Sequence, residues 1–247
     1  DLAYIHAYNN KAIIYDYLEQ YNQALAMYDK CIELDPKYIR VYNNKALLYE
    51  KLGQYDQALA MYDKCIELDP TYFNAYNNKA LLYEKFEQYD QALALYDKCI
   101  ELDPENIFPY WFKALLYADL GQYDQALAMY NKCLELDSED LESYNNKGLI
   151  YSDLEQYDQA LAMYDKIIEL DPKYHLSYFN KGLIYEKLGQ YDQALAMYDK
   201  IIELDPTYIN AYNNKGLIYY NLEQYDQALA LFDKCLELDP TYINAYN

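Results

Sequence analysis

The block YDQALAMYDK returns along this chain every 34 residues with few changes. Copies begin at Tyr55, Tyr89, Tyr123, Tyr157, Tyr191 and Tyr225, and a near copy begins at Tyr21. A strict period in this range predicts a solenoid, in which each repeat contacts only its neighbours. A solenoid offers a long face of aligned side chains and no single enclosed cavity, so the period favours binding over catalysis.

Small residues align the copies and set the frame: Ala12, Ala46, Ala80, Ala114, Gly148, Gly182 and Gly216. The alignment gives seven full repeats and a partial eighth, which are residues 5–38, 39–72, 73–106, 107–140, 141–174, 175–208, 209–242 and 243–247. Positions are counted from the first residue of each repeat, so that Ile5 is at position one. Because stacked repeats share one core, we expect residues 1–247 to form a single solenoid.

Each repeat has the pattern of two amphipathic helices. In the repeat 73–106, Tyr76, Ala80 and Tyr83 stand at i, i+4 and i+7, which is the spacing of one helical stripe. The same spacing begins again at Ala92, after a short polar segment. The closing Leu-Asp-Pro ends the second helix, because proline cannot continue the hydrogen-bond ladder. The predicted fold class is therefore all-α, a solenoid of antiparallel helix pairs.

Several positions keep one residue type, which favours a place in the core. The 36 tyrosines recur at positions 4, 11, 17, 24 and 34, and we expect most of them to be buried. Position 27 holds Cys31, Cys65, Cys99, Cys133, Ile167, Ile201 and Cys235. Because this position accepts either Cys or Ile, we expect it to be a small buried apolar slot, and neither part of a disulfide framework nor a zinc site. Lysine recurs at position seven, where its stem is expected to lie over a helix interface.

The formal net charge of −21 argues against nucleic acid or an anionic membrane as the main partner, because both need clustered Lys and Arg. A basic ligand is compatible with this charge. No apolar run approaches the ~20 residues of a membrane-spanning helix. Free thiols fit a reducing compartment, so we expect a cytoplasmic location.

The order of tyrosine, small residue and tyrosine, followed by Gly-x-Tyr-x-x-Ala and Leu-x-Pro, resembles the tetratricopeptide repeat. The repeat 39–72 carries this motif in Gly53, Tyr55, Ala58 and Pro70. The resemblance covers nearly the whole chain. It implies a right-handed superhelical solenoid whose first helices line a concave groove, which in this family commonly holds an extended peptide or a partner helix.

A helical wheel places positions four, eight and eleven on the buried side of the first helix, and positions two, five, six, nine, twelve and thirteen on the opposite arc. Two of these outer positions are rich in asparagine. Position six holds Asn10, Asn44, Asn78, Phe112, Asn146, Asn180 and Asn214. Position five holds Asn9, Asn43, Asn77, Trp111, Asn145, Phe179 and Asn213.

Rows of asparagine are suited to reading a peptide backbone, because a carboxamide both donates and accepts hydrogen bonds. The pattern is similar to the asparagine ladder of the O-linked N-acetylglucosamine transferase repeats. The alternatives are that these amides only bond the neighbouring helix, or that they reflect a coding bias towards asparagine.

Apolar side chains on the same arc are the other candidate contacts. Position nine holds an apolar row, Ile13, Leu47, Leu81, Leu115, Leu149, Leu183 and Leu217, which is typical of an interaction surface if it is exposed. The alternative is burial between adjacent first helices. Phe108, Trp111, Phe112 and Phe179 interrupt the pattern, and they are either anchors for a ligand or fillers of a gap beside Pro109.

Catalytic, metal and cofactor sites are not expected. His6 and His175 lie far apart and lack a recurring acidic or cysteine partner, and no phosphate loop, HExxH, GxSxG or calcium-loop motif is present. The family resemblance also offers a clamp for the acidic C-terminal tails of chaperones. That clamp needs Lys at position five and Asn at position nine, which this chain lacks, so such a tail is disfavoured.

The sequence therefore predicts a non-catalytic interaction scaffold that binds a protein or peptide partner along its groove. The alternative is a structural spacer, or an array that associates end to end. No polar capping helix follows Tyr242, and uncapped solenoid ends expose the docking surface of the next repeat. The uncapped end also fits a fragment of a longer protein, and the near identity of the repeats fits a consensus-like engineered array.

Overall fold

A computed structural model of the chain describes residues 2–241, with side chains from Tyr4 onward. The described residues form fourteen α-helices and no strand, as the repeat pattern predicts. The helices are α1 (Leu2–Tyr17), α2 (Tyr21–Leu34), α3 (Ile39–Lys51), α4 (Tyr55–Leu68), α5 (Phe73–Lys85), α6 (Tyr89–Leu102), α7 (Ile107–Asp119), α8 (Tyr123–Leu136), α9 (Leu141–Asp153), α10 (Tyr157–Leu170), α11 (His175–Lys187), α12 (Tyr191–Leu204), α13 (Ile209–Asn221) and α14 (Tyr225–Leu238).

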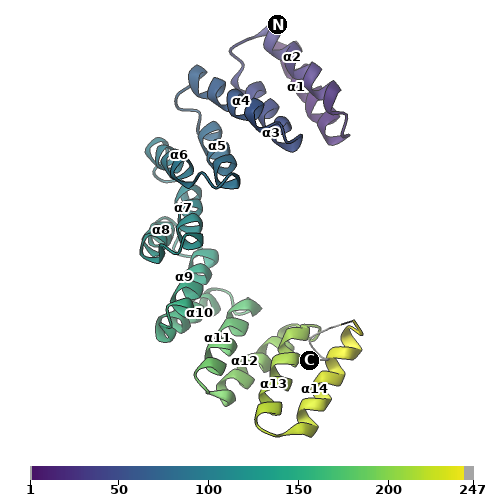
Figure 1. Cartoon of the computed structure of the whole chain (residues 1–247), viewed down its shortest axis with the longest axis vertical. Coiled ribbons are helices and arrows are strands. Elements are labelled where there is room, and N and C mark those ends of the chain that lie inside the picture. Colours follow the sequence, from purple (N-terminus) through teal and green to yellow (C-terminus); the bar gives the residue numbers. More distant parts are fainter. Residues whose placement is uncertain (1, 242–247) are drawn as a thin grey trace. The chain divides into compact units, whose positions relative to one another are not determined.

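The helices belong to two compact units, Asp1–Gln122 with α1 to α7 and Tyr123–Asn247 with α8 to α14. Within each unit, consecutive helices pack as antiparallel hairpins (Figure 1), and the second helix of one hairpin packs against the first helix of the next. That a single solenoid runs through both units stays a prediction. The partial repeat 243–247 lies outside the described residues.

A left-handed residue at position fifteen closes the turn inside each hairpin. After α3, Gly53 has a φ of 71°, its N–H donates to the carbonyl of Glu50 (2.9 Å), and the N–H of Gln54 donates to that of Tyr49 (2.8 Å). Paired bonds of this kind satisfy the last free carbonyls of a helix. Glutamate holds the same conformation in alternate repeats; in Glu87, φ is 57°.

The Leu-Asp-Pro segment makes the turn between hairpins. The N–H of Asp35 donates to the carbonyl of Cys31 (2.9 Å), and its carboxylate accepts from the N–H of Lys37 (2.9 Å). The hydroxyl of Tyr42, at position four of the next repeat, donates to the carbonyl of Pro36 (3.0 Å). The tyrosine at position four therefore fastens each repeat to the turn that precedes it.

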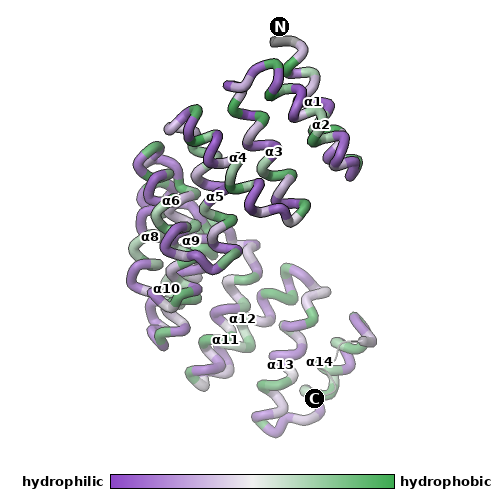
Figure 2. Tube along the Cα trace, turned by 45° about the horizontal axis from the view of Figure 1, so that its top comes forward, coloured by the Kyte–Doolittle hydropathy of each residue, from purple (hydrophilic) through white to green (hydrophobic). Residues whose placement is uncertain are grey.

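The core follows the repeat, with one exception. The position-24 tyrosines, such as Tyr62, and the cysteines at position 27 are buried, so the predicted apolar slot is confirmed. Figure 2 shows apolar and polar residues alternating along each helix. Contrary to expectation, the described tyrosines at positions 11, 17 and 34 are half-buried, except Tyr225, which is exposed. Those at positions 11 and 17 lie near helix ends and act as platforms for lysines. Lys45 Nζ lies 5.5 Å from the ring centre of Tyr49, and Lys51 Nζ lies 5.0 Å from that of Tyr21.

Gly189→Ala is expected to lower the free energy of unfolding by about 1 kcal/mol, because an L-residue is disfavoured at a φ of 69°. A Cβ at Gly189 would meet no atom within 4 Å, so the cost comes from the backbone alone. Glu155→Ala is the matched control and should be nearly neutral, since Glu155 already has a φ of 58°. Urea denaturation measures both; equal effects would contradict the backbone explanation.

Candidate functional site

The first helix of each repeat presents a surface that we call the first-helix face, formed by positions two, six and nine of the odd-numbered helices. The position-nine row lies at the surface and is not buried between neighbouring helices. Ile13 is 46% exposed, Leu47 44%, Leu149 43% and Leu217 41%, and the other members are half-buried. Each unit therefore carries a row of accessible apolar side chains along this face.

Carboxamides of adjacent repeats are hydrogen-bonded to one another. In each pair, position six donates from Nδ2 to Oδ1 of position five in the preceding repeat. The pairs are Asn44 to Asn9 (3.1 Å), Asn78 to Asn43 (3.1 Å) and Asn180 to Asn145 (3.3 Å). The rows of asparagine thus bond neighbouring first helices, which was one of the alternatives to a ligand-facing role.

Position five is less accessible than the helical wheel predicts. Asn9, Asn43 and Asn213 are buried, each 7% exposed, while Asn77 and Asn145 are half-buried. A wheel treats a helix in isolation, and here the next first helix covers this side. Position six is more open, because Asn10 is exposed and the other five asparagines of the row are half-buried.

Aromatic residues interrupt the amide pairing in the fourth repeat. Phe112 stands where a position-six asparagine would bond Asn77, and its ring stacks on Tyr96 with 5.7 Å between ring centres. The carbonyl oxygen of Asn77 is left buried without a hydrogen-bond partner. Trp111 packs edge-on against Phe112 at 5.4 Å, and Phe108 is 61% exposed. Phe112 thus fills the repeat interface, whereas Phe108 faces outward.

Phe179 interrupts the pairing in the sixth repeat. Its ring lies 5.9 Å from that of Tyr198 and 5.8 Å from that of Tyr208. Because Phe179 replaces the position-five asparagine that would accept a bond from the next repeat, Asn214 donates instead to the hydroxyl of Tyr198 (3.2 Å). Phe179 is therefore held by packing, and its predicted role as a ligand contact stays a prediction.

The lysines at position seven do more than cover an interface with their stems. From the second repeat onward, the position-seven lysine bonds position 25 of the preceding repeat, as in Lys45 to Asp29 and Lys79 to Asp63, both at 2.5 Å. In the fifth repeat the partner of Lys147 is the neutral amide of Asn131 (2.7 Å). Burial without a partner charge lowers the pKa of Lys147.

A contact that the sequence reading missed joins position 24 to position twelve of the same repeat. The hydroxyl of Tyr62 donates to the carboxylate of Glu50, and that of Tyr198 donates to Glu186. Burial raises the pKa of Glu186, and hydrogen bonding by Tyr198 opposes that rise. Three repeats keep Glu at position twelve, and this signal could have revealed the pair. The fifth repeat has Ser152 there.

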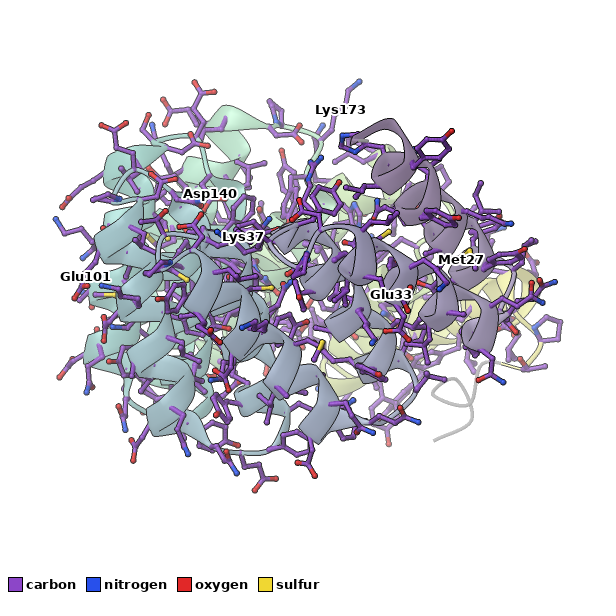
Figure 3. The ribbon with its side chains drawn as sticks, turned by 90° about the horizontal axis from the view of Figure 1, so that it is seen from above. Met27, Glu33, Lys37, Glu101, Asp140 and Lys173 are labelled. Atoms are coloured by element: carbon purple, nitrogen blue, oxygen red, sulfur yellow. The ribbon has the colours of Figure 1, made fainter. Side chains whose placement is uncertain are left out.

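Acidic and basic side chains cover the outer surface. In Figure 3, Glu101 of α6 projects away from the ribbon, and it pairs with Lys98 at 2.7 Å.

The two histidines lie beside tyrosines. His6 Nδ1 lies 3.3 Å from the hydroxyl of Tyr38, and His175 packs against Tyr208. Within residues 2–241, no group of three or more His, Cys, Asp or Glu side chains could hold a metal ion.

Comparison with known families identifies the repeat. A family profile described as Tetratricopeptide repeat matches residues 6–38, 39–72, 141–174, 175–208 and 209–242. The chain belongs to the tetratricopeptide repeat family. Two further profiles, described as Tetratricopeptide repeat and TPR repeat, match residues 61–94 and 114–154.

Solved tetratricopeptide repeat structures resemble this chain. YrrB, described as a TPR protein with an unusual peptide-binding site, is 28% identical with a TM-score of 0.59, over 76% of this chain and 97% of YrrB. MamA is 27% identical with a TM-score of 0.58, over 65% of this chain and 94% of MamA. The C-terminal part of a Cytophaga hutchinsonii TPR protein is 19% identical with a TM-score of 0.79, over 96% and 97% respectively, which shows likeness of fold alone. A comparison with curated proteins gives no match.

The tetratricopeptide repeat is generally a non-catalytic scaffold for protein interactions, and this chain has that fold. Among the helices of residues 2–241, none is both long and apolar enough to cross a membrane.

Alkaline pH is expected to destabilise this tetratricopeptide array. Burial raises the pKa of the Cys65 and Cys99 thiols from 9.0 to about 12, and that of Cys133 to about 11. Above pH 9 the unfolded chain releases these protons and the folded chain keeps them. Stability is therefore full below pH 9 and falls as the pH rises towards 11 to 12, by up to about 1.4 kcal/mol per thiol and pH unit.

Urea denaturation at pH 7.5, 9 and 10.5 measures this fall. Cys65→Ile is the control, because Ile167 and Ile201 occupy the same position in other repeats. This variant should show a shallower loss of stability with pH. An unchanged slope would show that the thiols do not contribute to the loss of stability. The cause would then be the buried tyrosines, such as Tyr62, whose pKa is also raised by burial.

Proposed function

We propose that the first-helix face binds an extended peptide or a partner helix, so that the chain acts as an adaptor. The observation that carries this proposal is the exposed position-nine row. Soluble proteins rarely leave aligned apolar side chains accessible unless a partner covers them. Here the exposed members, Ile13 and Leu47 in one unit and Leu149 and Leu217 in the other, recur at one position of the repeat. Leu81 and Leu115 in the first unit, and Leu183 in the second, are half-buried.

Carboxamides beside this row would supply polar recognition. Asn44 uses one N–H for Asn9, and its carbonyl oxygen has no hydrogen-bond partner among the described residues. The position-six amides of Asn44 and Asn78 each keep an acceptor and a second N–H, which can bond the main chain of a guest. The bonds between repeats hold the amides in place, and this preorganisation reduces the entropic cost of binding. The predicted amide contacts are Asn10, Asn44, Asn78, Asn146, Asn180 and Asn214.

Aromatic residues of the fourth repeat would supply an anchor. Phe108 is 61% exposed and Trp111 is half-buried against Phe112. Tryptophan and other aromatics dominate binding energy where they contact a partner.

The net charge of −21 favours neutral or basic guests over acidic ones. Five free, buried cysteines support our proposal of a cytoplasmic location.

The test compares two exposed leucines in a peptide-capture experiment. A random peptide library is selected on the wild-type chain, and the affinity of the best peptide is measured by calorimetry. Leu47→Gln, on the first-helix face, is expected to weaken binding about tenfold, because it removes apolar area from the contact. Leu34→Gln is the matched control: Leu34 is 51% exposed at the end of α2, away from this face, and its variant should bind normally. Equal effects of both variants, or none, would contradict the proposed surface.

A second candidate function is end-to-end association of copies into a spacer. The end helices favour it, since Tyr17 of α1 is 86% exposed and Leu229 of α14 is 61% exposed. Static light scattering over a concentration series should then show a rising mass, and Leu229→Gln should reduce that rise. A mass that stays at one chain, 29.4 kDa, at every concentration would exclude self-association.

A further inference from the structure

A cavity on the first-helix face of the C-terminal unit has a chemistry that the peptide proposal does not use. It has a volume of about 320 Å³ and lies between α9 and α11, with Tyr164 of α10 among its lining residues. Leu149 and Leu183, both at position nine, line it as well. This volume is at the low end for ligand pockets, so it suits a single side chain better than a cofactor.

The hydroxyl of Tyr164 is the unusual group in this cavity. The residue is 0% exposed, and its buried hydroxyl donates to no acceptor among the described residues. In the next repeat the equivalent hydroxyl, that of Tyr198, donates to Glu186 and accepts from Asn214. Asn180 lies beside Tyr164 in the place that Asn214 has beside Tyr198, and it acts to lower the pKa of Tyr164. The missing partner is therefore the acceptor.

Ser152 explains the missing acceptor. It occupies position twelve of this repeat, where Glu186 stands in the next one, and it lines the cavity. Serine is too short to replace the carboxylate, so the space that a glutamate would fill stays open. Asp153 is near enough to raise the pKa of Tyr164 through its charge, but it forms no hydrogen bond with the hydroxyl. An unmet donor in a buried site costs about 1 to 3 kcal/mol.

The ring of Tyr164 is also held in place. A Cβ at Gly148 of α9 would come within 2.7 Å of its Cζ, so the glycine lets the ring lie directly against the helix backbone. The hydroxyl is thus a fixed donor inside the cavity. A guest that supplies an acceptor there would meet it without reorganisation of the site.

The charges around the cavity select among acceptors. Its lining includes the carboxylates of Asp153 and Glu186, and one cation, Lys187, whose Nζ lies 5.9 Å from the ring centre of Tyr157. A further carboxylate brought in by a guest would be repelled by Asp153 and Glu186. A carboxamide fits better, because its oxygen can accept from Tyr164 while its nitrogen donates to Asp153. Its methylenes can contact Leu149 and Leu183.

We propose that this cavity is a subsite for the carboxamide of a glutamine or asparagine side chain, with Tyr164 as donor and Asp153 as acceptor. The inference rests on the proposed function in one respect, that the side chain belongs to a peptide on the first-helix face. The pocket itself can be tested without any peptide.

The first experiment titrates the whole chain with propionamide and follows the methyl signals of Leu149 and Leu183 by NMR. Propionamide should give saturable shifts at these methyls, and propionate, its charged analogue, should bind at least about tenfold more weakly. Tyr164→Phe keeps the ring and removes the hydroxyl, and should weaken propionamide binding about tenfold, as expected for one lost hydrogen bond. No shift, or tighter binding of propionate, would overturn the proposal.

Two reciprocal variants separate this pocket from a general effect of the probe. Ser152→Glu places a carboxylate within reach of Tyr164 and should abolish the shifts. Glu186→Ser combined with Lys187→Asp reproduces Ser152 and Asp153 beneath Tyr198 and should create a second site, reported by the methyls of Leu217. Circular dichroism checks that both variants fold. Unaltered titrations in both would overturn the assignment.

Peptide selection then tests the guest. Peptides captured by the wild-type chain should be enriched in Gln or Asn at one place, and the enrichment should be lost with Ser152→Glu. Capture without this enrichment would overturn the subsite and leave the proposed function intact. A propionamide response with no capture of any peptide would overturn the proposed function and leave the subsite intact.

Discussion

The burial of a tyrosine ring at position 24 is the interaction on which the repeat interface depends. Tyr198 is fully buried, donates to Glu186 of its own repeat and accepts from Asn214 of the next. Tyr96 stacks on Phe112 of the next repeat instead. Because one helix pair cannot bury its apolar faces alone, this residue joins both helices of its hairpin to the following one, and repeats are stable only as neighbours.

Polar contacts between repeats follow from that packing. With the hairpins in register, position seven reaches position 25, and position six reaches position five, of the preceding repeat. Buried polar groups need such partners, so the pairs fix the register more than they add stability. Where a member changes, the consequence is local: Asn131 leaves Lys147 without a partner charge, and Phe112 leaves the carbonyl of Asn77 unbonded.

The same logic explains why a nearly uniform array can carry a distinct site. An exchange at a solvated position changes little, but an exchange at a position that satisfies a buried donor leaves an unmet group. Ser152 in place of glutamate is such an exchange, and the cavity beside Tyr164 is its result. Recognition in a repeat protein can therefore arise from the loss of an internal partner as well as from the gain of a surface residue.

The sequence by itself determined the all-α hairpins, the ends of the helices at Leu-Asp-Pro and the buried slot at position 27, because each depends on local periodicity along one helix. It left open whether the position-nine row is exposed, and the structure places that row at the surface. Only the tertiary structure decided which side of the first helix the next repeat covers. Because the next repeat covers that side, Asn43 is buried and bonds Asn78, and Lys45 pairs with Asp29. The tertiary structure also shows that Tyr164 lacks the acceptor that Tyr198 has. These contacts join different helices, and a pattern read along one helix carries no information about the neighbour that meets it.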